Sequence, residues 1–179
     1  MSDPLFDRQR VQSILADEDI DVLIACRPEN FRYISAVCRP LEHSFVHEHT
    51  TYAMVSRDGE VAVVVPFFEL ESVQEEVCTG DMLLFRQFAG TAVDDQSDVA
   101  RGESVESGVA KKVSQLGSHK GRIGFDENFT SVCAFERLRE QLPHACLVPA
   151  SHVFDRIRQV KTAVEIERLR KSARIVELA

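Results

Sequence analysis

Short apolar runs alternate with amphipathic segments along most of this chain, and that alternation limits the folds open to it. The clearest run is Asp21–Cys26, a continuous apolar stretch typical of strands that are covered on both faces. Arg122–Phe125 and Ala145–Val148 repeat the pattern nearer the other end. Strands that alternate with helices favour an α/β domain built around a largely parallel sheet.

One pair of strands is predicted to run antiparallel. Tyr52–Ser56 and Glu60–Val65 are apolar, β-branched runs on either side of Arg57-Asp58-Gly59. An Asp-Gly pair between two such runs is a strong hairpin signal. With a further strand predicted over Met82–Phe85, we expect a mixed sheet of about five or six strands with helices on both faces.

Apolar residues at helical spacing predict helices between these strands. We expect them over residues 4–17, 28–34, 67–78 and 130–142. Ser2 or Asp3 is the expected N-cap of the first. In the last, Val132, Phe135 and Leu138 are expected to face inward. Residues 89–108 lose this periodicity and are acidic, which predicts a solvated loop before a helix that ends near residue 116.

The final helix begins at a clear signal. Thr162 and Glu165 have the spacing of a capping box, in which each side chain satisfies a backbone donor of the first turn. No Gly, Asn or Pro then interrupts the apolar stripe of Ile166, Leu169, Ala173 and Val176. From residue 151 onward basic residues outnumber acidic ones by 7 to 4, although the whole chain carries −8. We expect residues 1–155 to form one domain, and residues 156–179 to be a linker and the first helix of a truncated second domain.

Composition excludes several classes of protein. A net charge of −8 argues against nucleic acid or anionic membranes as partners, because both reward basic patches. The acidic N-terminus lacks the pattern of a secretory signal, so we expect a soluble, cytoplasmic protein. The five cysteines are scattered and form no Cys-x-x-Cys pair, which favours buried free thiols.

No motif in the chain predicts catalysis. It has neither of the common phosphate-binding glycine loops, no Gly-x-Ser-x-Gly and no His-Glu-x-x-His. His43, His47 and His49 fall in a predicted loop between residues 37 and 50. A metal site, exposed side chains without a special role, and contacts across an oligomer interface all remain open for them.

Two stretches together resemble the creatinase/prolidase/Xaa-Pro aminopeptidase family of metallopeptidase-like hydrolases. Asp19–Ser35 is similar to the family's opening strand and its Asn-x-x-Tyr motif, here Asn30 and Tyr33. The second stretch, from Ile123 to Ala173, contains a segment similar to the family's interdomain junction, carried by Arg158, Lys161, Thr162, Glu165 and Ile166. Ala36 departs from the pattern, because the family usually has Gly there.

The resemblance implies a ribonuclease-H-like creatinase N-terminal domain, followed in full-length relatives by a "pita-bread" catalytic domain. That second domain holds two divalent metal ions (Mn, Co or Zn) through Asp, Asp, His, Glu and Glu, and none of these ligands is expected in this chain. We therefore expect no catalytic and no metal-binding residue here. The parent would be a Xaa-Pro dipeptidase or aminopeptidase that acts on proline-containing peptides with a metal-activated water.

The resemblance also implies a partner and a role. Such N-terminal domains dimerise and cap an active-site cleft, sometimes that of the partner subunit, so we expect a homodimer. Our hypothesis is that His47 or His49 contacts the partner subunit's substrate. Two alternatives stay open: the N-terminal domain of a creatinase-type amidinohydrolase that acts on a small guanidino compound, and a protein-binding module of a pseudo-peptidase.

Overall fold

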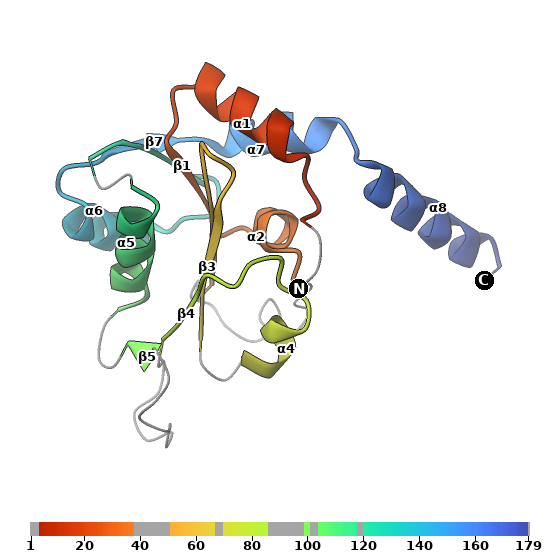
Figure 1. The fold of residues 1–179 in the computed structure, drawn as a ribbon, viewed down its shortest axis with the longest axis horizontal. Coiled ribbons are helices and arrows are strands. Elements are labelled where there is room, and N and C mark those ends of the chain that lie inside the picture. The colour runs from red at the N-terminus through yellow and green to blue at the C-terminus, as the bar shows by residue number, and fades with distance from the viewer. Residues whose placement is uncertain are drawn as a thin grey trace.

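The computed structural model describes residues 4–37, 51–66, 70–85, 99–100, 104–117 and 120–178. A central sheet carries helices on both faces, and the last helix extends away from this body (Figure 1). The predicted α/β class, with a mixed sheet covered on both sides, is therefore confirmed. Each helix within these ranges is too short or too polar to reach across a lipid bilayer.

The sheet of the described residues has the strand order β5-β4-β3-β2-β1-β6-β7. In sequence order the strands are β1 Val22–Ala25, β2 Tyr52–Ser56, β3 Val61–Pro66, β4 Met82–Phe85, β5 Val99–Ala100, β6 Arg122–Phe125 and β7 Cys146–Pro149. Among them only β2 runs against its neighbours, since it pairs antiparallel with both β1 and β3. The predicted hairpin is confirmed: Gly59 adopts a φ of 80° in the β2–β3 turn, a conformation that glycine reaches without strain.

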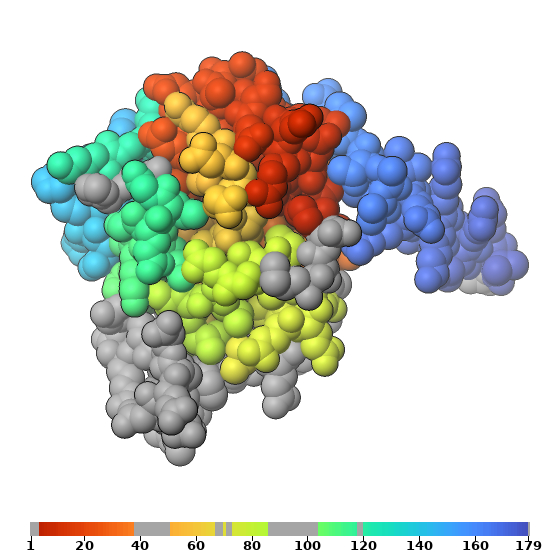
Figure 2. Space-filling view, in the orientation of Figure 1, coloured from red at the N-terminus to blue at the C-terminus, as the bar shows by residue number. Residues whose placement is uncertain are grey.

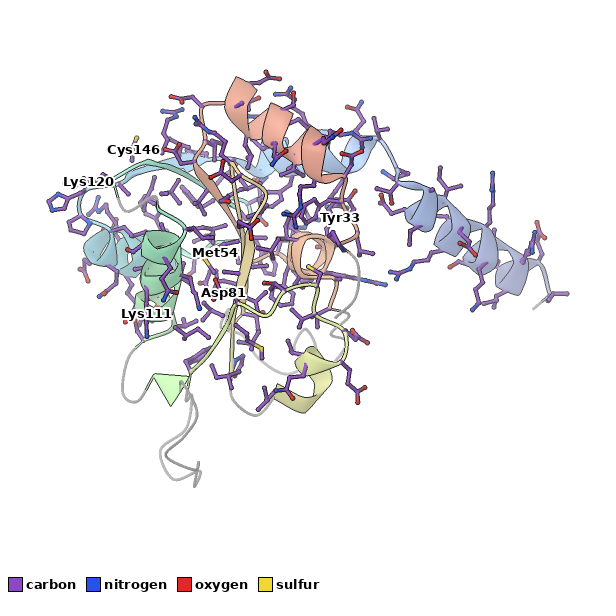
Figure 3. The ribbon with its side chains drawn as sticks, in the orientation of Figure 1. Tyr33, Met54, Asp81, Lys111, Lys120 and Cys146 are labelled. Carbon is purple, nitrogen blue, oxygen red and sulfur yellow. The ribbon has the colours of Figure 1, made fainter. Side chains whose placement is uncertain are left out.

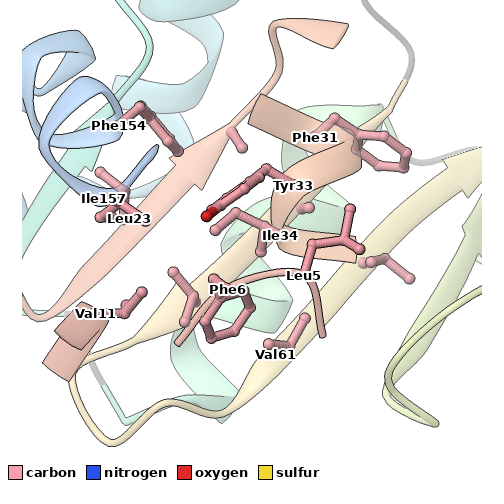
Figure 4. Packing of buried hydrophobic residues seen from close by; sticks show 14 of the residues in the cluster. Leu5, Phe6, Val11, Leu23, Phe31, Tyr33, Ile34, Val61, Phe154 and Ile157 are labelled. Atoms are coloured by element: carbon pink, nitrogen blue, oxygen red, sulfur yellow. The ribbon is translucent and has the colours of Figure 1, made fainter. Parts of the chain in front are cut away.

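The helices fall on two sides of the sheet. They are α1 Arg8–Asp17, α2 Pro28–Ser35, α4 Leu70–Gln74, α5 Val105–Gln115, α6 Val132–Gln141, α7 Ser151–Gln159 and α8 Ala163–Glu177. Val11 of α1, Phe31 of α2 and Phe154 of α7 belong to one buried cluster, part of which Figure 4 shows. Val109 of α5 and Leu138 of α6 belong to the other.

Strand β1 explains why its sequence is apolar without interruption. Successive side chains of a strand point to opposite faces, so Leu23 and Ala25 enter the first cluster while Val22 and Ile24 enter the second. All of these residues are at most 1% exposed. A strand covered on both faces has no position left for a polar side chain.

Two helix boundaries differ from prediction. Helix α1 begins at Arg8 rather than near Pro4, because the Asp7 side chain accepts a hydrogen bond from the Arg10 backbone N–H and so caps the helix. The helix predicted over residues 67–78 is described only as the short α4, which ends at residue 74. The chain then turns inward, and the backbone N–H of Cys78 donates to the carbonyl of Ser35 at 2.9 Å.

Other predictions were wrong about exposure. Helix α5 begins inside the predicted solvated loop, and its Glu106 is 3% exposed beside Arg137, 3.8 Å away. Val132, predicted to face inward, is 79% exposed because it opens α6 at the surface. Buried thiols were expected, but Cys133 and Cys146 are exposed. The two-residue strand β5 also lies within the predicted loop.

Helix α8 has the predicted capping box but almost no packing. The Thr162 side chain accepts from the Glu165 backbone N–H, and the Glu165 carboxylate accepts from that of Thr162. None of the residues of α8 is buried. Figure 2 shows the helix projecting from the body as an arm. Most of what holds α8 in place must therefore act at its first turns.

Candidate functional site

The histidines that we predicted to contact substrate, His47 and His49, lie outside the described residues, as does His43. Their role stays a prediction. The described residues instead bring together the two stretches that carry the family resemblance. Helix α2 carries the first, α7 and the start of α8 carry the second, and side chains of the two bond directly.

Asp126 is the buried centre of this meeting point. It directly follows β6 and is 1% exposed. Its Oδ2 accepts hydrogen bonds from Asn30 Nδ2 at 2.7 Å and from the Arg27 backbone N–H at 3.2 Å. Its Oδ1 lies 3.0 Å from the Ser151 hydroxyl. A buried carboxylate is tolerated where such bonds replace the water it has lost.

Asn30 connects this carboxylate to a guanidinium group. Asn30 is 3% exposed, and its Oδ1 accepts a hydrogen bond from Arg158 Nη1 at 2.9 Å while its Nδ2 donates to Asp126. Each polar end of the amide therefore has a charged partner, which strengthens both bonds. We call Asn30, Asp126, Ser151 and Arg158 the junction network, because it ties α2, the end of β6 and α7 together.

The junction network lies at the switch point of the sheet, where the helices that follow neighbouring strands pack on opposite faces. Strands β1 and β6 are adjacent and parallel, but the helices that follow them, α2 and α6, pack on opposite faces. In open α/β sheets, ligands commonly bind in the crevice at such a switch point. Here Asn30 and Asp126 are buried there and bonded to each other, so the protein's own side chains occupy the crevice.

Glu127 provides the cap that the start of α7 lacks in its local sequence. Its Oε2 accepts from the backbone N–H groups of Ala150 and Ser151 at 2.9 and 2.8 Å. The Ser151 hydroxyl also lies 2.7 Å away, and its single proton serves either Glu127 or Asp126 at one time. Partial burial by itself would raise the pKa of Glu127, but these hydrogen bonds outweigh it and hold the pKa below its usual value.

The first turn of α8 is attached to the body through Tyr33. The Tyr33 hydroxyl donates to Glu165 Oε2 at 3.0 Å, and Figure 3 shows Tyr33 on α2. Burial, followed by the hydrogen bond to Glu165, raises the pKa of Tyr33, so the phenol keeps the proton that it donates. The Thr162 hydroxyl donates to the carbonyl of Leu5 at 3.3 Å. These bonds fix where α8 leaves the domain.

The junction network joins segments of the domain, and the nearby thiol is not set up for covalent chemistry. Cys26 lies near the network, with its sulfur 3.3 Å from the Thr130 hydroxyl, but burial raises its pKa to about 12, so the thiol stays protonated. Among the described residues, no three His, Cys, Asp or Glu side chains are grouped so as to hold a metal ion. The polar groups of Asn30, Asp126 and Ser151 are hydrogen-bonded within the network.

Sequence reasoning gave no role to Asp126, Glu127 or Ser151, and it did not predict α7. The residue before α7, Ala150, makes no side-chain cap, so the usual start signal is absent. A weaker signal was present: two acidic residues follow the buried strand β6 directly, at the edge where its backbone groups lose their partners.

Comparison with solved structures places this fold among peptidase domains. The chain is similar to a Xaa-Pro dipeptidase from Bacillus anthracis, with 16% identity, a TM-score of 0.63, and coverage of 89% of this chain and 37% of that one. It is also similar to a dipeptidase from Pyrococcus horikoshii, with 16% identity, a TM-score of 0.65, and coverage of 89% and 38%. This chain thus spans less than two fifths of the length of either protein.

A third structure matches over almost its whole length. The N-terminal domain of a cytoplasmic peptidase from Mycobacterium tuberculosis has 16% identity and a TM-score of 0.59, with coverage of 84% of this chain and 96% of that one. Identities this low show a shared fold. The search of curated proteins finds no match. The family model of the creatinase/prolidase N-terminal domain matches residues 8–160, which include the whole junction network, and the chain belongs to that family.

Proposed function

We propose that this chain is the non-catalytic N-terminal domain of a Xaa-Pro dipeptidase- or aminopeptidase-like hydrolase, where it caps the active-site cleft and takes part in a homodimer. Membership of the creatinase/prolidase N-terminal family supports this role. So does the match to a solved N-terminal domain over 96% of that domain's length. We propose further that residues 1–155 form the accessory domain and residues 156–179 lead into a catalytic one.

The observation that carries the proposal is the apolar side of α8. The helix is anchored at Glu165, yet Leu169 is 58% exposed and Val176 is 75% exposed. An isolated helix of this length is marginal in water unless an apolar face is covered. An ordered helix with an uncovered stripe is the form expected of an element that packs against a further domain.

The chemistry of the proposed parent would reside in that further domain. Among the described residues no three metal-ligating side chains are grouped, and we assign the two divalent ions that the family implies to the further domain. Bound in the catalytic domain, they would activate water for attack on the carbonyl of an Xaa-Pro bond. The contribution of this chain is positional: the hydrogen bonds from Tyr33 to Glu165 and from Thr162 to Leu5 set the direction of α8 and hence of whatever continues from it.

One experiment tests the accessory role. The 179-residue chain and the longer protein that contains it are assayed for release of proline from Ala-Pro, with Mn²⁺, Co²⁺ or Zn²⁺ added. We expect turnover by the longer protein alone. Hydrolysis by the 179-residue chain would refute a non-catalytic role. A longer protein that binds a protein partner but hydrolyses nothing would instead indicate the pseudo-peptidase module.

A second experiment tests the apolar stripe in the longer protein. Leu169→Glu combined with Val176→Glu places charges where we propose interdomain packing, and we expect activity to fall at least about tenfold, as two buried charges cost several kcal/mol. The matched control is Lys171→Glu, on the opposite side of α8, which should leave activity within about twofold. Equal effects of both variants would contradict the assigned face.

The dimer and the histidines need their own measurements. Light scattering on the longer protein is expected to give twice the monomer mass, and a monomer at micromolar concentration would overturn the homodimer.

Changing His47 and His49 to alanine should alter KM or kcat if either contacts the partner subunit's substrate. Unchanged values of both constants would remove that role.

A further inference from the structure

A pocket lies between α2 and the first turns of α8. Its volume is about 430 Å³. Small-molecule sites in proteins typically span about 300–1,000 Å³, so the pocket has room for one compact ligand. It is lined by residues of α2, of the segment between α7 and α8, and of one face of α8: Glu29, Arg32, Tyr33, Arg158, Lys161, Glu165, Arg168, Leu169 and Ser172, with Leu5 from the N-terminal segment.

The lining is cationic in an otherwise acidic chain. Four basic and two acidic side chains line the pocket, whereas the whole chain carries −8. Both carboxylates already have partners: Glu29 accepts from Arg27 Nε at 2.9 Å, and Glu165 accepts from Tyr33 and Thr162. The net formal charge of the lining is positive, because its basic side chains outnumber its acidic ones and Glu29 is paired with Arg27 from outside the pocket.

Two of the basic side chains are available to bind an anion. Arg32 on α2 and Arg168 on α8 are both exposed, and neither has a carboxylate partner among the residues that the structure describes. A guanidinium group matches the geometry of a carboxylate or phosphate through two parallel hydrogen bonds. Because these two groups come from different elements, an anion that reaches both would bridge the body of the domain to α8.

The remaining lining narrows the class of anion. Leu5 offers apolar surface, and Tyr33 adds an aromatic ring. Inorganic phosphate has no carbon atoms to bury against these walls. A carbon skeleton with two or more carboxylate groups would use both features at once, with its charges on the arginines and its methylene groups on Leu5 and Tyr33.

We propose that this pocket is a binding site for a small organic polycarboxylate, which joins Arg32 to Arg168 and holds α8 against α2. This site goes beyond the accessory role proposed above and does not depend on it. The bound anion would add a bridge to the attachment that Tyr33 and Glu165 already provide, so the direction of α8 would respond to the concentration of the ligand.

Calorimetric titration of the 179-residue chain with citrate tests the proposal. A ligand of this size in an open pocket is expected to bind with a Kd of about 1 mM or tighter. Changing Arg32→Gln together with Arg168→Gln should weaken binding by about tenfold or more, because each lost charge-assisted bond is worth roughly that factor. The matched control removes two guanidinium groups from another side of α8, Arg170→Gln with Arg174→Gln, and should change the Kd by less than about threefold.

Two further arms complete the test. Pyrophosphate at the same ionic strength should bind more weakly than citrate, and tighter binding of pyrophosphate would overturn the carboxylate class. Citrate should also slow trypsin cleavage after Lys161, since the bridge would hold the segment before α8. No heat of binding up to about 10 mM citrate, or equal weakening by the control pair, would overturn the site. None of these readouts measures hydrolysis, so failure here leaves the proposed function untouched.

Discussion

Replacement of Asn30 by alanine tests whether the junction network stabilises the domain. The change removes the 2.7 Å hydrogen bond to Asp126 Oδ2 and the 2.9 Å bond from Arg158 Nη1. Arg158 is only partly buried, so water can replace its lost partner. Asp126 is 1% exposed and keeps only the Arg27 N–H and Ser151 contacts. A bond to a buried charged group is worth about 1.5–3 kcal/mol, and with the gap that the carboxamide leaves behind we expect a loss of about 3 kcal/mol.

Urea denaturation followed by circular dichroism measures this loss. The midpoint should fall while the slope with denaturant stays constant, because the same surface is exposed on unfolding. The apparent Tm should drop by about 6–12 °C for a domain of this size. The matched control is Asn128→Ala: Asn128 is exposed two residues beyond the same carboxylate, and its loss should cost less than about 0.5 kcal/mol. Equal destabilisation by the two changes, or a loss below about 1 kcal/mol for Asn30→Ala, would refute the reasoning.

Three further predictions follow from single sites. Ala36→Gly should raise stability by about 0.5–1 kcal/mol in urea denaturation, because Ala36 has a φ of 68° and relief of that left-handed strain exceeds the entropy that glycine adds to the unfolded chain. The wild-type protein should lose stability as the pH falls from about 5 to 3, since the folded-state pKa of Glu127 lies below its unfolded value. In thermal melts, Glu127→Gln should have a lower Tm than the wild type at pH 7, and its Tm should change less with pH between about 5 and 3. A thiol-reactive dye should label exposed Cys133 and Cys146 quickly and Cys26 only on unfolding, since burial raises the pKa of Cys26 to about 12; fast labelling of Cys26 would contradict that burial.

Local sequence signals predicted much of the backbone. The uninterrupted apolar run of β1, the Asp58-Gly59 hairpin and the Thr162 capping box were all read correctly, because each depends on residues within a few positions of one another. The errors arose where a local signal was missing or overruled. Helix α7 begins without a side-chain cap of its own, and Val132 keeps helical spacing although α6 starts at the surface.

Local signals could not predict the candidate site, because its contacts join residues that are far apart in the sequence. Asn30 lies 96 residues from Asp126 and 128 residues from Arg158 in the sequence, and Tyr33 lies 132 residues from Glu165. The family resemblance marked Asn30, Tyr33, Arg158 and Glu165 but did not say which would meet. The tertiary structure decides that, because it packs α2 and α7 against the same face of the sheet.

The sequence by itself determined the alternation of strands and helices, the antiparallel hairpin, the capped start of α8 and the family to which the chain belongs. The tertiary structure decided that a buried carboxylate fills the crevice between β1 and β6, and that two arginines from separate helices face one pocket. The reason is physical: backbone conformation responds to near neighbours in the chain, whereas burial and hydrogen-bond partners depend on which distant segments the sheet places side by side.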